Sequence, residues 1–384
     1  MTMIPLSKPY FDEREVEAAA RVIRSGKVGG GGLVGRELEQ EMAERFGVRH
    51  VLTTTSCTHA MEAALMACGV GRGDEVICPS FTFTTTATSI VQRGARPVFV
   101  DIEADTYNID PHEIAKAVTP RTKGIMPVHY AGHACDMDAI MAMAEKHRLF
   151  VIEDAAHAIG AGHKGQPLGT VGDIGCFSFH ETKNLVCGEG GALLTNDDDL
   201  AAKLETIREK GTNRAAFLRG DVDKYTWVSA GSSYVLSDIL AAIALEQLRK
   251  LDEITAARTA IAERYVEELQ GVEGIVLPVV KPYAQPNWHI FAIRVPDGTR
   301  DEFIAALRRE GIGATFHYVP LHSSPFGRQV GRQVGDLAVT DLVARTLVRL
   351  PLFPAMSFVD SCDVIEASIA ASPHAPMIES VRGC

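Results

Sequence analysis

The chain has 384 residues and a mass of 41.5 kDa, which is long for a single hydrophobic core and predicts two domains. Hydrophobic residues make up 46% of it and charged residues 23%, as in an ordinary globular enzyme. The formal net charge of −11 argues against broad binding to nucleic acids or anionic membranes, so local basic groups and backbone amides must hold any anionic ligand.

The N-terminal segment and the cysteines indicate where the protein works. Acidic residues occur in MTMIPLSKPYFDEREVE where a signal peptide would carry its apolar core, and no apolar run reaches the length of a membrane span. Eight cysteines are scattered without paired spacing, which is typical of reduced core thiols and not of a disulfide framework or a zinc site. We therefore expect a cytoplasmic protein without a bound metal.

Short apolar runs alternate with helical patterns from about residue 48 to 200. The expected strands are His50–Thr54, Glu75–Cys78, Arg96–Asp101, Gly124–His129, Leu149–Asp154, Cys176–Phe179 and Ala192–Thr195. The expected helices are Thr58–Cys68, Thr84–Arg93, Pro111–Val118 and Met137–His147. This alternation predicts a mostly parallel sheet with helices on both faces, in which ligands bind beyond the carboxyl ends of the strands. No helix separates the last two strands, so we expect them to pair antiparallel.

The pattern changes after Ser237. Residues 238–270 are rich in Ala, Leu and Glu and predict a long helical stretch with breaks near Asp252 and Gly271. The elements expected beyond it are strands at Trp288–Val295 and Ala314–Val319 and helices at Arg300–Glu310 and Val359–Ala371.

The two halves predict an α/β protein of two domains. We expect a large, mostly parallel-sheet α/β domain over residues 1–250 and a smaller α+β domain over residues 251–384, reached through the long helix. The tandem GRQVGRQV at residues 327–334 is too short to indicate a repeat fold, and we expect it to be a surface loop.

One lysine lies in a setting that favours covalent chemistry. Lys183 lies in the polar link HETKN, between the strand-like residues 176–179 and the glycines of GEGG. A lysine on a tight, glycine-flanked loop beside buried strands can lose its hydration, which lowers its pKa and frees the amine to attack a carbonyl. Proteins hold pyridoxal phosphate (PLP) as a Schiff base through such an amine, although a loop lysine is more often a solvated surface residue.

A carboxylate and a histidine follow one another in VIEDAAHA. Asp154 ends a strongly apolar strand, where its charge is costly unless it is matched to a cation such as a protonated pyridine nitrogen. Capping of a following helix is an equally good explanation from the residues alone. His157 could hydrogen-bond a ring hydroxyl, although an isolated histidine is usually structural.

Three further segments offer groups for a phosphate and a flat ring. The turn TSCTHA places Cys57 and Thr58 at a helix start, where hydroxyls and free amides bind anions; plain helix capping is the alternative. Phe83 follows a strand end and can lie against a ring, although a core phenylalanine is commoner. Ser178 alternates with Phe177 and Phe179, so its hydroxyl faces away from both and could reach the same phosphate.

Taken together, these segments resemble the DegT/DnrJ/EryC1/StrS family of nucleotide-sugar aminotransferases, which are PLP-dependent enzymes of fold type I. The likeness covers almost the whole chain, through SGKVGGGG, TSCTHAMEAAL, GDEVICPSFTF, PVFVDIEADTYNID, PVHYAGHACDMD, EDAAHA, SFHETKN, GEGGA and HYVPLH. It implies that Lys183 forms the Schiff base and that Asp154 partners the pyridinium nitrogen. The other cofactor contacts that it implies come from Thr58, Ser178, the amide of Cys57, Phe83 and His157.

One branch of the family resembles the chain further. Residues 207–227 and 231–238, IREKGTNRAAFLRGDVDKYTW and GSSYVLSD, are similar to the dTDP-4-amino-4,6-dideoxygalactose transaminases. That likeness implies transfer of an amino group from L-glutamate to C4 of dTDP-4-keto-6-deoxy-D-glucose, with release of 2-oxoglutarate. Many relatives carry Asn-Tyr-Arg at residues 233–235, where the Asn reaches the phosphate of the neighbouring subunit's cofactor, and Ser233 takes that position here.

Because the chain has a net negative charge, basic side chains near the active site must bind the diphosphate of the substrate. The resemblance implies a homodimer or higher homo-oligomer with shared active sites, in which residues 29–32 and 211–235 cross to the partner. His322 is expected to close over the sugar, and His317 is less favoured because it falls inside a strand-like run. The other candidate substrate contacts are Lys27, Arg214, Arg219, Lys224 and Tyr225.

Alternative functions remain open on the sequence. Relatives that dehydrate C3 of a deoxysugar carry His at the lysine position, so Lys183 argues against that chemistry. Amination at C3 of a 3-ketosugar stays an alternative. A non-catalytic PLP-binding regulator is a further one, and the intact set of Lys183, Asp154 and Thr58 argues against it.

Overall fold

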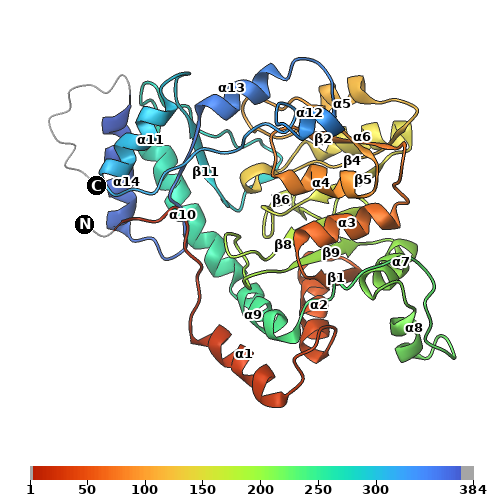
Figure 1. Cartoon of the computed structure of the whole chain (residues 1–384). Coiled ribbons are helices and arrows are strands. Elements are labelled where there is room, and N and C mark those ends of the chain that lie inside the picture. The colour runs from red at the N-terminus through yellow and green to blue at the C-terminus, as the bar shows by residue number, and fades with distance from the viewer. Residues whose placement is uncertain (1–2, 373–384) are drawn as a thin grey trace.

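The computed structural model describes residues 3–372, and its centre is one eight-stranded sheet (Figure 1). The strand order is β1-β9-β8-β5-β4-β2-β3-β12. Its strands are β1 (His50–Thr54), β2 (Glu75–Pro79), β3 (Arg96–Val100), β4 (Thr122–Ile125), β5 (Phe150–Asp154), β8 (Ile174–Ser178), β9 (Gly191–Thr195) and β12 (Arg332–Gln333). All neighbours are parallel except β9, which runs antiparallel to β1 and β8. The predicted mostly parallel sheet with an antiparallel last pair is confirmed.

Helices lie on both faces of this sheet because its strands alternate between two apolar layers. Val76 and Cys78 of β2 pack in the layer of α3, α4 and α7, whereas Ile77 packs in the layer of α5 and α6. Helices α2 and α9 cover a neighbouring part of that second face, around Phe177. The helices of this half are α1 (Glu13–Ser25), α2 (Leu33–Phe46), α3 (Cys57–Ala67), α4 (Thr84–Gln92), α5 (Pro111–Ala117), α6 (Met137–His147), α7 (Asp198–Arg208), α8 (Arg214–Arg219) and α9 (Asp238–Arg249), with a short 3-10 turn at Tyr130–Gly132.

The predicted long helical stretch is two helices that meet at Lys250. Helix α9 ends there and α10 (Leu251–Leu269) begins directly after it. Lys250 is fully buried and its ammonium forms ion pairs with Glu15 and Asp12, which fastens the start of α1 to this junction.

A second apolar core lies beyond α10. It is built on the antiparallel pair of β11 (Phe291–Arg294) and β13 (Leu347–Leu350), and the N-terminal segment joins it through a bridge between Ile4 and Ile312. The remaining elements of the chain are α11 (Arg300–Arg309), α12 (Gly327–Val330), α13 (Ala338–Thr346), α14 (Phe358–Ala371), β6 (Gly162–His163), β7 (Gln166–Pro167) and β10 (Ala284–Gln285). The division into domains at residue 250 stays a prediction.

Two expectations for the C-terminal half were wrong. The tandem GRQVGRQV is not a loop: it forms α12 and then β12, because Arg332 and Gln333 pair with Val98 and Phe99 at the edge of the large sheet. Residues 314–319 are not a strand. Only Thr315 bridges to β13, and the chain then leaves that pairing and passes along the carboxyl-end side of the large sheet.

No helix within residues 3–372 is long and apolar enough to cross a membrane. Six cysteines of that range are free thiols, namely Cys57, Cys68, Cys78, Cys135, Cys176 and Cys187, and the range holds no cluster of His, Cys, Asp and Glu suited to a metal ion. Cys384 lies outside the described residues.

Gly191 lies so close to neighbouring backbone atoms that a substitution there can test the packing of the sheet against α3. A Cβ at Gly191 would lie 2.6 Å from the amide nitrogen of Cys57 and from the carbonyl oxygen of Phe177. We expect Gly191→Ala to lower the free energy of unfolding by about 1–3 kcal/mol, because backbone atoms cannot yield as a flexible side chain can. Chemical denaturation measures this. The control is Gly71→Ala, where the added Cβ would meet no atom of residues 3–372 within 4 Å beyond its own chain neighbours, and equal midpoints for the two variants would contradict the expectation.

Candidate active site

The carboxyl ends of β5 and β8 and the start of α3 border a cavity of about 470 Å³. This size is within the range of small-molecule sites. Of the eight residues predicted to bind the cofactor, seven line it: Cys57, Thr58, Phe83, Asp154, His157, Ser178 and Lys183. The eighth, Ser233, is exposed and does not line it. Segments from 57 to 183 thus meet in one place because parallel strands present their carboxyl ends at one edge.

Asp154 is the last residue of β5 and is buried, with 4% of its surface exposed. One carboxylate oxygen accepts a hydrogen bond from Thr86 Oγ1 at 2.7 Å and the other accepts one from the Ala156 amide at 3.2 Å. Burial raises the pKa of Asp154, and these two hydrogen bonds oppose the rise. No helix begins after Asp154, since residues 156–160 form turns, so the helix-capping alternative is wrong.

Lys183 lies in the loop between β8 and β9, where its amide donates to His180 O at 2.9 Å. Its removal from water lowers the pKa of the amine to about 8, while the nearby charge of Asp154 acts in the opposite direction. A substantial fraction of the amine is therefore neutral near pH 8. The sequence predicted this direction from the glycine-flanked loop beside buried strands.

The N-terminus of α3 is built to receive an anion. Ser56 caps the helix by accepting a hydrogen bond from the His59 amide at 3.1 Å, which leaves the amides of Cys57 and Thr58 without a protein acceptor in residues 3–372. The orphan amides and the helix dipole both favour negative charge there. Ser178 ends β8 in the same cavity.

The C-terminal half supplies residues that sequence reasoning missed. His289, Tyr318 and Arg349 line the cavity together with His317, which had been less favoured than His322. His317 Nδ1 lies 3.1 Å from the hydroxyl of Tyr130, and removal from water lowers the pKa of His317 to about 2. The motif HYVPLH, which contains His317 and Tyr318, was the sequence signal for these cavity residues. His317 was ranked too low because a regular strand was expected at residues 314–319.

The prediction for His322 is corrected. The side chain is buried away from the cavity, its Nδ1 lies 2.8 Å from Ser80 Oγ, and its own amide donates to the same hydroxyl at 3.0 Å. The histidine fastens residues 321–322 to the end of β2. It cannot close over a ligand while these bonds hold it.

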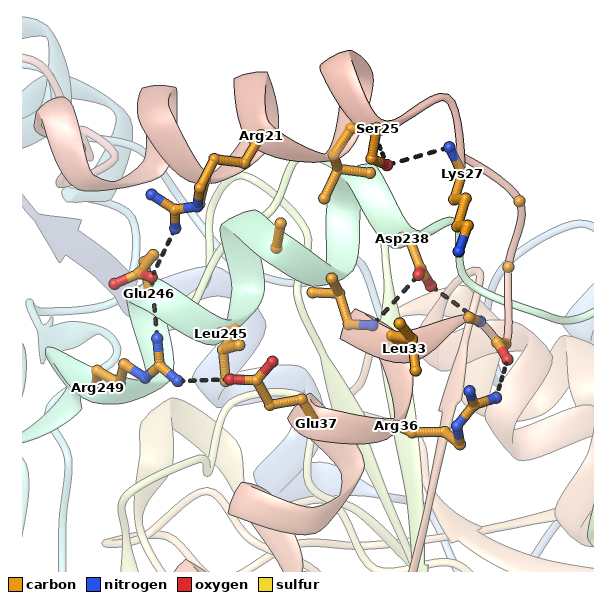
Figure 2. A pocket seen from close by; sticks show the side chains of 18 of the residues that line it. Arg21, Ser25, Lys27, Leu33, Arg36, Glu37, Asp238, Leu245, Glu246 and Arg249 are labelled. Atoms are coloured by element: carbon orange, nitrogen blue, oxygen red, sulfur yellow. Dashed lines mark hydrogen bonds and ion pairs between the residues drawn. The ribbon is translucent and has the colours of Figure 1, made fainter.

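Lys27 and Arg214 line a second cavity of about 1010 Å³, formed by α1, residues 29–37 and α9 (Figure 2). Asp238 fixes the glycine loop of this second cavity, because its carboxylate accepts hydrogen bonds from the amides of Gly32 and Val34 at 3.0 and 3.2 Å. The other candidate substrate contacts, Arg219, Lys224 and Tyr225, line neither cavity.

Comparison with known proteins identifies the chemistry of this fold. The profile described as the DegT/DnrJ/EryC1/StrS aminotransferase family matches residues 9–368. The chain belongs to this family. It is 40% identical over 373 residues to the spore coat polysaccharide biosynthesis protein SpsC of Bacillus subtilis (strain 168), covering 95% of this chain and 96% of SpsC.

Solved structures agree over almost the whole length. DesV of S. venezuelae is 34% identical, with a TM-score of 0.89 over 97% of this chain and 99% of DesV. The PLP form of the putative sugar aminotransferase Spr1654 from Streptococcus pneumoniae is 28% identical, with a TM-score of 0.89 over 96% and 99% of the two chains. As a member of this family, the protein is a PLP-dependent sugar aminotransferase with the fold of that enzyme group.

The first cavity of this aminotransferase fits the cofactor by the chemistry of its groups. Asp154 is a buried carboxylate with no ion-pair partner in residues 3–372, as a pyridinium nitrogen requires. The amides of Cys57 and Thr58 lack acceptors, as a phosphate requires, and Lys183 offers an amine with a lowered pKa.

The coupling between Lys183 and Asp154 gives a pH prediction. The carboxylate raises the pKa of Lys183, so Asp154→Asn should move the titration of the amine below its value of about 8. Only the neutral amine attacks an aldehyde, and the rate at which cofactor-free protein regains its yellow colour with added PLP therefore reports the midpoint. Glu189→Gln, which removes a carboxylate from the same cavity, should leave the midpoint in place. If Asp154→Asn left the midpoint unchanged, the effect of the Asp154 charge on the pKa of Lys183 would be refuted.

Proposed function

We propose that this sugar aminotransferase moves the amino group of L-glutamate to C4 of dTDP-4-keto-6-deoxy-D-glucose, giving a dTDP-4-amino-4,6-dideoxyhexose and 2-oxoglutarate. The observation that carries the amino transfer is the amine of Lys183, with its lowered pKa, in one cavity with the buried carboxylate of Asp154. The choice of C4 is supported by residues 207–238, whose sequence resembles the C4-aminating branch.

Lys183 is the proposed general base and acid. Its Nζ would take the proton from the Cα of the amino donor and deliver it to C4′ of the cofactor in the first half-reaction, and would take a proton from C4′ and deliver it to C4 of the sugar in the second. Bound PLP supplies the electron-accepting ring that makes those carbons acidic. Asp154 holds a proton at the ring nitrogen, and Thr86 fixes the orientation of that carboxylate through its 2.7 Å hydrogen bond.

His157 is neutral and has a defined proton position. Burial lowers its pKa well below the ordinary value, and its Nδ1 accepts the Ala131 amide at 3.3 Å. The ring proton is therefore on Nε2, which lies 3.4 Å from the hydroxyl of Tyr318. We propose that this Nε2–H donates to the ring oxygen of the cofactor, while Phe83, which is 57% exposed, lies against the ring face.

The phosphate contacts come from Cys57, Thr58 and Ser178 in this proposal. Ser233 and the basic segment 211–225 lie outside this cavity in their own chain. We therefore propose a homodimer in which they, with Lys27, serve the partner's site and meet the cofactor phosphate and the substrate diphosphate. The candidates for the diphosphate and the base are Lys27, Arg214, Arg219, Lys224 and Tyr225.

A product analysis tests the whole assignment. The purified enzyme with dTDP-4-keto-6-deoxy-D-glucose and L-glutamate should form 2-oxoglutarate and amino sugar in equal amounts, with the new amine at C4 by NMR. If the enzyme aminated only a 3-ketosugar isomer, the position of amination would be C3 and the proposed C4 would be wrong. A yellow protein that glutamate does not bleach and that aminates neither sugar would favour the binding role over the enzyme.

Removal of the two central groups should separate their roles. Lys183→Ala should lose the yellow colour and lower turnover by about 100-fold to 10,000-fold or more, because the proton carrier is gone. Asp154→Asn should retain some cofactor and still lose at least about 100-fold in rate, because a neutral amide cannot hold the ring proton. Lys123→Ala, an exposed lysine on β4, is the control. Turnover near wild type in Lys183→Ala would exclude it as the base.

A further inference from the structure

His289 is a buried histidine of the active-site cavity that the proposed proton transfers do not use. It is 7% exposed and lines the same cavity as Lys183. Its backbone is held from two sides, because its amide donates to Asn287 Oδ1 at 3.0 Å and its carbonyl accepts from Arg258 at 3.2 Å. Its ring lies beside that of His157, with centroids 4.5 Å apart. The imidazole is therefore fixed next to the residue proposed to meet the ring oxygen of the cofactor.

The hydrogen bonds around His289 fix the position of its proton. Its Nδ1 lies 3.1 Å from Oδ1 of Asn184. The side-chain nitrogen of Asn184 donates to the carbonyl of Asn287 at 3.0 Å, so the atom that faces His289 is the oxygen, which only accepts. Nδ1 therefore carries the proton and Nε2 keeps its lone pair. Burial lowers the pKa of His289 well below its ordinary value, so the ring stays neutral in this form.

Nε2 of His289 is an acceptor to which no group within residues 3–372 donates a hydrogen bond. Two other buried histidines, His133 and His163, also have an unpartnered Nε2, but theirs is sealed inside the protein. Nε2 of His289 is not sealed and its side chain lines the cavity, so the lone pair reaches space that a ligand can occupy. A polar atom in a buried site is costly when unpaired, so this atom requires a ligand that donates an O–H or N–H.

The neighbouring histidine presents the opposite kind of atom. Nδ1 of His157 accepts the Ala131 amide at 3.3 Å, so the Nε2 of His157 donates where that of His289 accepts. Asn184, which orients His289, directly follows Lys183 in the chain. The acceptor is thus fixed relative to the loop that carries the reactive amine.

The chemistry of the two substrates selects the group that can meet this acceptor. The carboxylates of glutamate only accept hydrogen bonds, whereas the hydroxyls of a sugar also donate them. In dTDP-4-keto-6-deoxy-D-glucose the reacting carbon, C4, has two neighbours in the ring. C3 carries a hydroxyl, whereas C5 carries the methyl group and the ring oxygen. The hydroxyl that lies next to the reacting carbon is therefore the one on C3.

We propose that Nε2 of His289 accepts a hydrogen bond from the C3 hydroxyl of the ketosugar. The histidine moves no proton: it orients C4 toward Lys183 and makes the enzyme prefer sugars that keep this hydroxyl, because a sugar without it leaves the acceptor unpaired. This inference rests on the proposed 4-ketosugar substrate.

Removal of either partner of this hydrogen bond tests the proposal. The measurement is kcat/KM for dTDP-4-keto-6-deoxy-D-glucose and for dTDP-4-keto-3,6-dideoxy-D-glucose, which lacks the C3 hydroxyl. Wild-type enzyme should prefer the first sugar by about 10-fold to 100-fold. His289→Asn, whose shorter amide can keep the bond to Asn184 but offers no acceptor at the Nε2 position, should prefer it by less than about threefold. His289→Gln, which can place an amide oxygen there, should retain part of the preference.

The matched control is His163→Asn, since His163 is buried with an unpartnered Nε2 but does not line the cavity. Its preference between the two sugars should equal that of the wild type, even if the variant is less stable. Equal preferences in the wild type and in a folded His289→Asn variant would overturn the proposal. So would a wild-type enzyme that does not distinguish the two sugars.

A binding measurement without turnover completes the test. Calorimetric titration of the aminated enzyme uses dTDP-6-deoxy-D-glucose, which has no ketone and cannot react, and its 3-deoxy counterpart. Wild type should bind the first about tenfold more tightly, and His289→Asn should bind both alike. If product analysis finds the new amine at C3, the proposed substrate fails. The non-reacting pair would still decide whether His289 binds the hydroxyl at C3.

Discussion

The buried carboxylate of Asp154 at the end of β5 is the constraint on which the rest of the site depends. A charged group in that position is costly, and within residues 3–372 only two neutral hydrogen-bond donors meet it, from Thr86 and from the Ala156 amide. A protonated ring nitrogen would supply the missing positive charge. The same burial that makes the carboxylate costly also lowers the pKa of Lys183, so one cavity prepares both groups.

The cavity is completed by a polar network between distant parts of the chain. Asn184, next to the reactive lysine, donates to the carbonyl of Asn287, and its Oδ1 lies 3.1 Å from His289 Nδ1. Asn287 in turn donates to the carbonyl of His157 at 2.9 Å. Arg258 of α10 binds the carbonyl of His289. The loop of the lysine and the turn after β5 are therefore fixed relative to each other through the C-terminal half.

The sequence correctly predicted the sheet and the site residues that lie close to strand ends. Asp154, Ser178 and the start of α3 were found because parallel strands place their carboxyl ends together. His289, Tyr318 and Arg349 were missed, and His317 was ranked below His322, because their positions depend on how the C-terminal half packs against the sheet, which no local periodicity records. His322 was misplaced for the same reason: its bond to Ser80 joins residues 242 positions apart.

The pairing of β12 with β3 has a consequence for how the chain is made. The outer edge of the large sheet is covered by residues 332–333, which emerge from the ribosome long after β3 itself. Until then β3 presents unpaired backbone groups, which invite association with other chains. A polypeptide that stops before residue 327 would keep all seven other strands of the sheet and still carry that open edge. A prematurely terminated chain would therefore be prone to aggregate through the open edge of β3. This holds even though every residue predicted to contact the cofactor has already been synthesised.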